Sequence, residues 1–138
     1  MNKKAAIIDL DGTLVDCNSF TLYVKRMMWR HPRIILYALA RKLRLVSHAQ
    51  AKEWIMGAPV SSEELETFVD ELARHVRLEV FNLGEGMTRV LATAAPYSYS
   101  SILAKRLRFD HIIGTHKGKP ECKGVEKLKG VQALCERE

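Results

Sequence analysis

Two kinds of hydrophobic pattern divide this 138-residue chain, and their order restricts the possible folds. Residues 5–8 form an apolar run without alternation, which is typical of a strand buried on both faces of a parallel sheet. Residues 17–78 instead repeat apolar side chains every three or four positions, which indicates helices. Residues 89–93 and 111–114 are again short apolar runs that predict strands. The sequence therefore predicts an α/β fold in which a helical block follows the first strand.

Proline and serine positions predict the helix boundaries. The apolar spacing favours a first helix that ends at Pro32 and a second over residues 34–43. Ser47 and Ser61 are each followed three residues later by Gln or Glu, which is the capping-box pattern at the start of a helix. Pro96 lies where a further helix would begin, between the second and third strands. The order strand, helix, strand predicts parallel pairing.

The same pattern predicts two units. We expect residues 1–16 and 79–138 to form a Rossmann-like parallel sheet with flanking helices, joined by right-handed crossovers. Residues 17–78 are expected to form a helical cap. In open parallel sheets the chemistry gathers at the carboxyl ends of the strands. Asp9 and Thr93 both lie at such ends in this prediction.

Charge and cysteine content indicate which partners and which cellular compartment to expect. The net charge of +6 favours anionic partners such as phosphorylated metabolites, nucleic acid or acidic lipid surfaces, although a basic soluble face would also account for it. Cys17, Cys122 and Cys135 are too few and too widely spaced for a disulfide framework or a zinc motif. The longest apolar stretch, residues 34–40, is too short to span a bilayer. We expect a cytoplasmic protein with reduced thiols.

The residues after the first strand carry the clearest chemical signal. A buried strand would bring Asp9 to the sheet edge, and Asp11, two residues on, can face the same cleft. Gly12 leaves room for a phosphate to approach backbone N–H groups. One carboxylate can then act as a nucleophile that forms an acyl phosphate, and the other as a general acid and base. The alternative is an ordinary aspartate–glycine turn at a strand end.

Three segments resemble one family. Residues 9–15 (Asp-Leu-Asp-Gly-Thr-Leu-Val) resemble the first motif of the haloacid-dehalogenase-like superfamily, and residues 90–96, with Thr93, resemble its second motif. The third motif, a lysine near the start of a later helix, is matched by Lys127 in the spacing typical of the phosphoserine-phosphatase-like branch, subfamily IB. Lys123 is the weaker candidate. The helical block falls where that branch carries a helical cap.

This resemblance implies a phosphate-monoester hydrolase that acts on a small phosphorylated metabolite through an aspartyl phosphate. Asp9 would be the nucleophile and Asp11 the general acid and base. Mg²⁺ would be held by Asp9 and by the backbone carbonyl of Asp11. Because a halide leaves without a proton, the presence of Asp11 favours phosphatase over dehalogenase chemistry. The resemblance also implies a set of phosphate-binding groups, namely the backbone around Leu10 and Gly12, the Thr93 hydroxyl and the Lys127 amine.

The superfamily's fourth motif has no counterpart in the sequence. That motif supplies acidic metal ligands after a further strand, but no paired aspartates follow Asp110, and the last acidic residues are Glu136 and Glu138. We therefore expect a core and a magnesium site that are incomplete at the C-terminus, and slow turnover, unless Glu136 or a partner chain completes the site. The alternative function is a non-catalytic remnant that binds a phosphorylated ligand or a partner through a basic cap. We do not expect nucleic-acid binding, because no recognised motif accompanies the basic residues.

Overall fold

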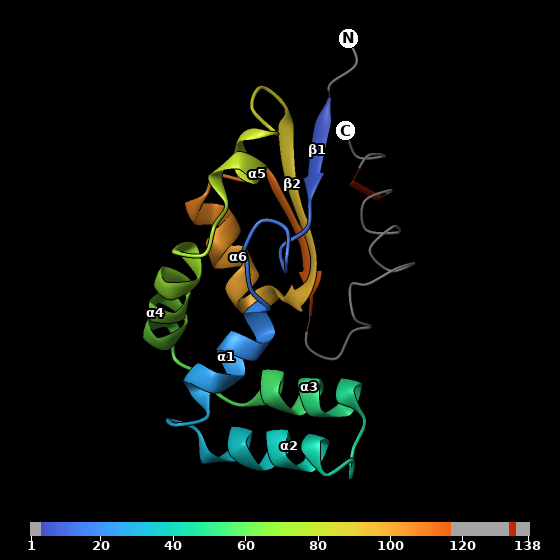
Figure 1. Ribbon diagram of the computed structural model, residues 1–138, viewed down its shortest axis with the longest axis vertical. Coiled ribbons are helices and arrows are strands. Elements are labelled where there is room, and N and C mark those ends of the chain that lie inside the picture. Colours follow the sequence, from blue (N-terminus) through green and yellow to red (C-terminus); the bar gives the residue numbers. More distant parts are fainter. Residues whose placement is uncertain (1–3, 117–132, 135–138) are drawn as a thin grey trace.

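Three parallel strands form the sheet in the computed structural model, which describes residues 4–116 and 133–134 (Figure 1). Strands β1 (Ala5–Ile8), β2 (Thr88–Pro96) and β3 (His111–Thr115) lie in the order β1-β2-β3. In the register of the sheet, Ile8 lies opposite Leu91. The predicted α/β fold with a parallel sheet is thus confirmed. The later helix expected to begin near Lys127 falls mostly outside the described residues.

The segments between the strands are mainly helical. Helix α6 (Tyr97–Arg106) connects β2 to β3 and lies between the sheet and α4 (Figure 1). The chain between β1 and β2 forms five helices, which are α1 (Ser19–Met27), α2 (Pro32–Lys42), α3 (His48–Gly57), α4 (Ser62–Ala73) and α5 (Leu78–Asn82). Of these, α5 was not predicted from the sequence pattern. No helix among the described residues is long and apolar enough to cross a membrane.

The two serine caps were predicted correctly, but the role of Pro32 was not. Ser61 forms a full capping box with Glu64 at the start of α4, and the Ser47 hydroxyl accepts a hydrogen bond from the Gln50 N–H at the start of α3. The first helix ends at Met27, and Pro32 is the first residue of α2. Proline suits that position because a first-turn N–H has no intrahelical partner to lose.

An aromatic cluster packs the helical segment onto the core. Tyr23 of α1 and Phe68 of α4 contact Tyr99 of α6, with ring centroids 5.3 and 4.9 Å from that of Tyr99. The Tyr99 hydroxyl lies 2.8 Å from the buried Ser19 hydroxyl in α1. Burial raises the pKa of Tyr23 to about 12, so this tyrosine stays neutral at physiological pH. Helices α1 and α4 are therefore fixed against α6.

The two segments that connect the helical segment to the core lie side by side. Val15 forms an antiparallel bridge with Val76, and the Arg77 N–H donates to the Leu14 carbonyl at 2.7 Å. The chain therefore leaves and re-enters the core at one place. This pairing supports the boundaries that we propose for the cap, residues 17–78 between core segments 1–16 and 79–138.

Helices α2 and α3 form a hairpin at one end of the molecule, opposite the end at which β1 begins (Figure 1). Ile34 of α2 and Ile55 of α3 are buried, and the rings of Tyr37 and Trp54 lie 5.4 Å apart between the two helices. The strands of the sheet point toward this end in Figure 1. The hairpin therefore lies beyond the carboxyl edge of the sheet, the edge at which the predicted chemistry gathers.

Candidate functional site

Asp9 and Asp11 follow β1 directly in a tight loop. One Asp9 carboxylate oxygen accepts a hydrogen bond from the Leu10 N–H at 2.8 Å. One Asp11 oxygen accepts from the N–H of Ser19, the first residue of α1, at 2.7 Å. The N-terminus of a helix carries a partial positive charge that stabilises an anion. The loop thus anchors both carboxylates at the carboxyl edge of the sheet.

Gly12 supplies the backbone conformation that this loop needs. Its φ of +70° lies in the left-handed region, and no atom lies within 4 Å of the position that a Cβ would occupy. Its N–H donates to the Cys17 carbonyl at 3.3 Å, and the Leu10 N–H is engaged by Asp9. The two backbone groups expected to bind phosphate therefore donate within the loop, and a phosphate would have to share or exchange these bonds.

Thr93 reaches the same edge from the neighbouring strand. Ile8, the last paired residue of β1, lies opposite Leu91, and Thr93 follows two residues beyond Leu91 on β2. The Thr93 side chain is fully buried, and its hydroxyl oxygen accepts from the Ala95 N–H at 3.0 Å. Thr93 thus lies on the strand beside β1, but β2 continues three residues past it to Pro96 and does not end at Thr93 as predicted. Lys127, Lys123, Glu136 and Glu138 lie outside the described residues.

The side chain of Lys52 also reaches this region, although the sequence pattern did not predict it as a site residue. It belongs to α3 and is only 8 % exposed. Its Nζ donates to the carbonyl oxygen of Ala94 at 2.8 Å and lies 5.4 Å from the centroid of the Phe20 ring. The hydroxyl of Thr115 donates to the same carbonyl at 2.8 Å. A buried cation from the helical segment thus lies one residue from Thr93.

The Asp9 carboxylate and the Asp11 backbone carbonyl are oxygen ligands of the kind that a hard divalent cation prefers. Among residues 4–116 and 133–134, the one group of three His, Cys, Asp or Glu side chains close enough to hold an ion is Asp16, Cys17 and His75. Among the described residues, no such group therefore includes Asp9 or Asp11.

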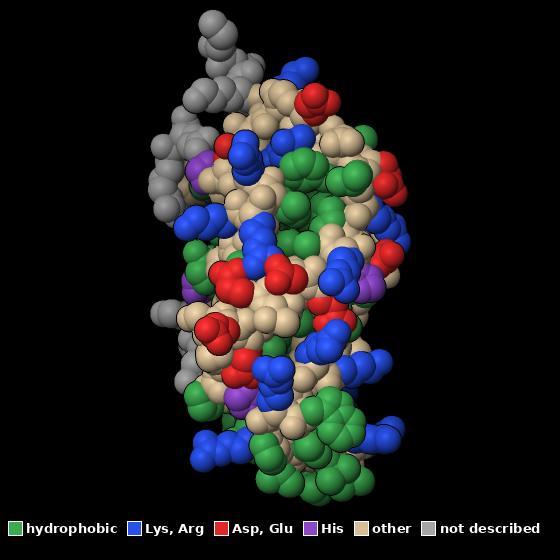
Figure 2. All heavy atoms as spheres, turned by 90° about the vertical axis from the view of Figure 1, so that its left-hand side faces the viewer, with side chains coloured by type: hydrophobic (Ala, Val, Ile, Leu, Met, Phe, Trp, Pro, Cys, Tyr) green, Lys and Arg blue, Asp and Glu red, His purple; other side chains and the backbone are tan. Residues whose placement is uncertain are grey.

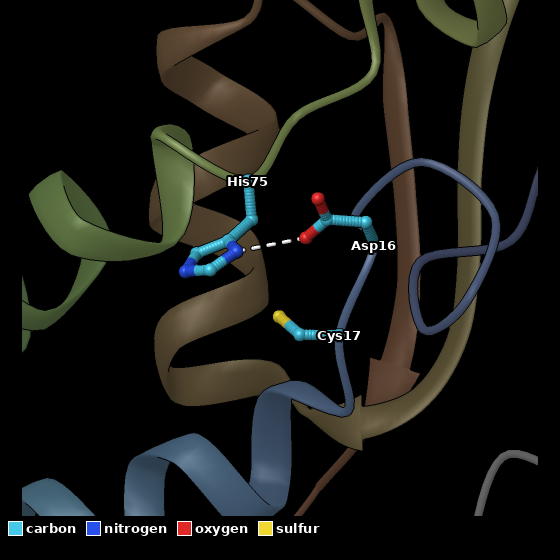
Figure 3. Close-up of side chains that lie close together, drawn as sticks. All are labelled: Asp16, Cys17 and His75. Carbon is cyan, nitrogen blue, oxygen red and sulfur yellow. Dashed lines mark hydrogen bonds and ion pairs between the residues drawn. The ribbon is translucent and has the colours of Figure 1, made fainter.

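The group of Asp16, Cys17 and His75 lies where the two connecting segments meet (Figure 3). The Nδ1 of His75 and a carboxylate oxygen of Asp16 are 2.8 Å apart, and the ligand atoms of all three lie within 4.8 Å. Burial, and then the charge of the Asp16 carboxylate, raise the pKa of the Cys17 thiol. Since only the thiolate is a good metal ligand, this group acts mainly as a polar contact between the segments.

The parallel sheet and the helices inserted after β1 define an α/β protein, with the candidate aspartates directly after β1. The model of the haloacid dehalogenase-like hydrolase family matches residues 6–138, so the chain belongs to that family. The resemblance in the motifs is thereby confirmed. Hydrolases of this family generally use a divalent metal ion, in keeping with the carboxylate pair.

Solved structures share the fold at low sequence identity. A protein of unknown function from Bordetella pertussis Tohama I is 18 % identical, with a TM-score of 0.69 over 99 % of this chain and 76 % of that one. A HAD family hydrolase from Salmonella enterica serovar Typhi is 11 % identical, with a TM-score of 0.70 over 97 % of this chain and 52 % of that one. A phosphoserine phosphohydrolase-like protein from Francisella tularensis SCHU S4 is 12 % identical, with a TM-score of 0.57 over 96 % and 74 %. No curated protein sequence matches significantly.

Proposed function

We propose that the chain is a phosphate-monoester hydrolase that acts on a small phosphorylated metabolite in the cytoplasm. The observation that carries this proposal is that Asp9 and Asp11 directly follow β1, with Thr93 on the adjacent strand β2 two residues beyond the partner of Ile8, in a member of a hydrolase family. An aspartate pair of this kind can divide the reaction between a nucleophile and an acid. The likeness to a phosphoserine phosphohydrolase-like fold agrees with it.

In the proposed reaction an Asp9 oxygen attacks phosphorus and the ester oxygen leaves with a proton from Asp11. Asp11 then takes a proton from a water molecule, whose oxygen attacks the aspartyl phosphate and releases inorganic phosphate and the Asp9 carboxylate. Mg²⁺ held by the Asp9 carboxylate and the Asp11 backbone carbonyl would reduce the repulsion between the two anions. The hydrogen bond from the Ser19 N–H holds Asp11 in place through this cycle.

We expect the phosphate of the substrate to be bound by groups around the carboxyl edge of the sheet. The loop N–H groups of Leu10 and Gly12, the Thr93 hydroxyl and the Lys127 amine are the groups that we propose, with Lys127 lying beyond the described residues. Lys52 adds a cation on the side of the helical segment, next to Thr93. Charge-assisted hydrogen bonds of this kind are stronger than neutral ones and suit a dianionic phosphate.

Turnover of a panel of phosphate monoesters, with p-nitrophenyl phosphate included and Mg²⁺ present, tests the proposal. We expect slow but measurable hydrolysis that Asp9→Asn abolishes, because the carboxamide is not a nucleophile. Glu85→Gln, which removes a carboxylate exposed elsewhere on the surface, should leave the rate unchanged. Hydrolysis that survives Asp9→Asn would contradict the proposal, as would the absence of turnover for every monoester.

A second candidate function is binding without turnover. It is favoured by the lack of a third His, Cys, Asp or Glu ligand beside Asp9 and Asp11 among the described residues. Such a protein would bind a phosphorylated ligand and leave it intact. Inorganic phosphate should then raise the thermal midpoint of unfolding, while no monoester is hydrolysed by the wild-type chain. Magnesium-dependent hydrolysis lost in Asp9→Asn would exclude this candidate.

A further inference from the structure

The outer side of α2 exposes a row of leucines. Leu36, Leu39 and Leu43 are 63, 48 and 60 % exposed, and their spacing of three and four residues places them on one side of the helix. The opposite side carries Ile34, which is fully buried. A helix that is apolar all round is normally covered all round. Here one apolar side packs inside the hairpin and the other faces solvent.

Large apolar side chains also stand at both ends of α2. Trp29, in the turn before the helix, is 81 % exposed, and Leu45, just after it, is 73 % exposed. We call Trp29, Leu36, Leu39, Leu43 and Leu45 the apolar face. An exposed tryptophan has a substantial cost in water, but it is favoured where an apolar phase meets a polar one. Contiguous patches of this kind in monomers mark interaction sites.

The sequence around the apolar face is entirely free of acidic residues. Residues 18–52 contain no Asp or Glu, and they contain eight Lys and Arg residues against a net charge of +6 for the whole chain. Arg26 pairs with Glu71, and Lys52 is buried. The other six are exposed, namely Lys25, Arg30, Arg33, Arg41, Lys42 and Arg44.

These charges border the apolar face. In helical projection, Arg33 and Lys42 fall on opposite sides of the leucine row. Figure 2 shows hydrophobic side chains gathered at the end of the molecule formed by the α2–α3 hairpin, with Lys and Arg side chains to either side and acidic side chains farther away. An apolar stripe bordered by basic residues is the pattern of a helix that lies in a membrane interface.

We infer that the apolar face docks on a membrane surface that contains anionic lipids. The leucines and Trp29 would enter the boundary between head groups and acyl chains, while the exposed basic residues contact lipid phosphates. A second copy of the chain is a poorer occupant, because it would bring the same positive charges together. Since the strands point toward this end of the molecule, docking would turn the carboxyl edge of the sheet toward the membrane.

Vesicle flotation with the 138-residue chain tests the inference. We expect at least about tenfold stronger partitioning onto phosphatidylcholine vesicles that contain phosphatidylglycerol than onto pure phosphatidylcholine, because each basic residue near an anionic surface contributes about fivefold. Added salt should weaken this partitioning by screening. Equal partitioning on the two vesicle types, or none on either, would overturn the inference, and this comparison needs no variant.

Paired variants then locate the surface. Arg33→Glu with Lys42→Glu should reduce partitioning at least about tenfold, whereas Lys4→Glu with Lys105→Glu, the same charge change at exposed sites elsewhere, should reduce it much less. Leu36→Gln with Leu43→Gln should also reduce it strongly. Its matched control is Leu78→Gln with Leu83→Gln, which alters leucines 65 and 74 % exposed outside the apolar face.

A second copy of the chain is the competing partner for the apolar face. Size-exclusion chromatography with light scattering should find no dimer whose formation depends on Leu36 and Leu43. A dimer that Leu36→Gln with Leu43→Gln dissociates, together with no binding to anionic vesicles, would assign the face to a second copy and overturn membrane docking. Equal losses in the apolar-face variants and their controls would also overturn it.

Discussion

The role that we propose for Lys52 follows from its buried position in the fold. Its stem lies in the buried face of α3 with Ala51 and Ile55, and its ammonium group ends against the Ala94 carbonyl next to Thr93. A buried lysine is unusual unless its charge is used. We infer that it helps to bind the phosphate of the substrate and holds α3 against the end of β2.

Lys52→Met separates these two roles. Methionine keeps most of the apolar stem, and the Ala94 carbonyl keeps its hydrogen bond from Thr115, so the free energy of unfolding should fall by only about 1 kcal/mol. The KM for phosphate monoesters should rise severalfold, because a cation near the phosphate is lost. The exposed Lys105→Met is the control. An unchanged KM in Lys52→Met would remove the binding role.

At the site, the sequence predicted the residues that follow strands and missed the one that depends on tertiary contact. Asp9, Asp11 and Thr93 were predicted to share an edge because parallel strands end together. Asp9 and Asp11 do follow β1 directly, whereas β2 continues past Thr93 to Pro96. Lys52 was missed because a lysine in a helix is usually exposed. Its only sequence signal is its place three residues before Ile55, on the apolar side of α3.

At the scale of the element, the carboxylate of Glu64 stabilises the first turn of α4. Glu64 completes the capping box and also contacts His31, with the His31 Nε2 and a Glu64 carboxylate oxygen 2.7 Å apart. The hydrogen bond with His31 lowers the pKa of Glu64 below its ordinary value of 4.5, although burial opposes this shift. A lowered folded-state pKa means that the unfolded chain binds the proton more tightly.

The stability that Glu64 contributes should therefore be fully present above pH 4.5 and be lost as the pH falls through the lower folded-state value. Urea unfolding at neutral and acidic pH measures it. Glu64→Gln should lower the free energy of unfolding at neutral pH and show a weaker decline below pH 4.5. Glu63→Gln, at an exposed neighbour in the same turn, should keep the decline. An identical pH dependence in wild type and Glu64→Gln would contradict the assignment.

Element boundaries were predictable where a side chain fixes the backbone. Ser47 and Ser61 cap their helices as expected because a hydroxyl accepts the free first-turn N–H. Pro32 was misread, because proline disfavours helical geometry at the residue before it but is well tolerated in a first turn. Helix α5 has five residues, too few to show a hydrophobic period.

At the scale of the molecule, the helical segment is tied to the core by an aromatic cluster and by side-by-side connections. The site and the apolar face therefore belong to one packed structure, with the site at the carboxyl edge of the sheet and the apolar face beyond it. The sequence order of strands and helices predicted this architecture. It did not predict the exposed side of α2, because periodicity alone does not distinguish an apolar side that is covered from one that is not.

The central claim is that Asp9 accepts the phosphoryl group, and intact-mass spectrometry of Asp11→Asn tests it most directly. With p-nitrophenyl phosphate and Mg²⁺, the leaving group departs without needing a proton, while water attack on the aspartyl phosphate lacks its base. We expect the acid-quenched protein to gain the mass of one phosphoryl group, mapped to Asp9 and absent when Asp9→Asn is added. An unchanged mass, or a phosphoryl group on another residue, would contradict the account.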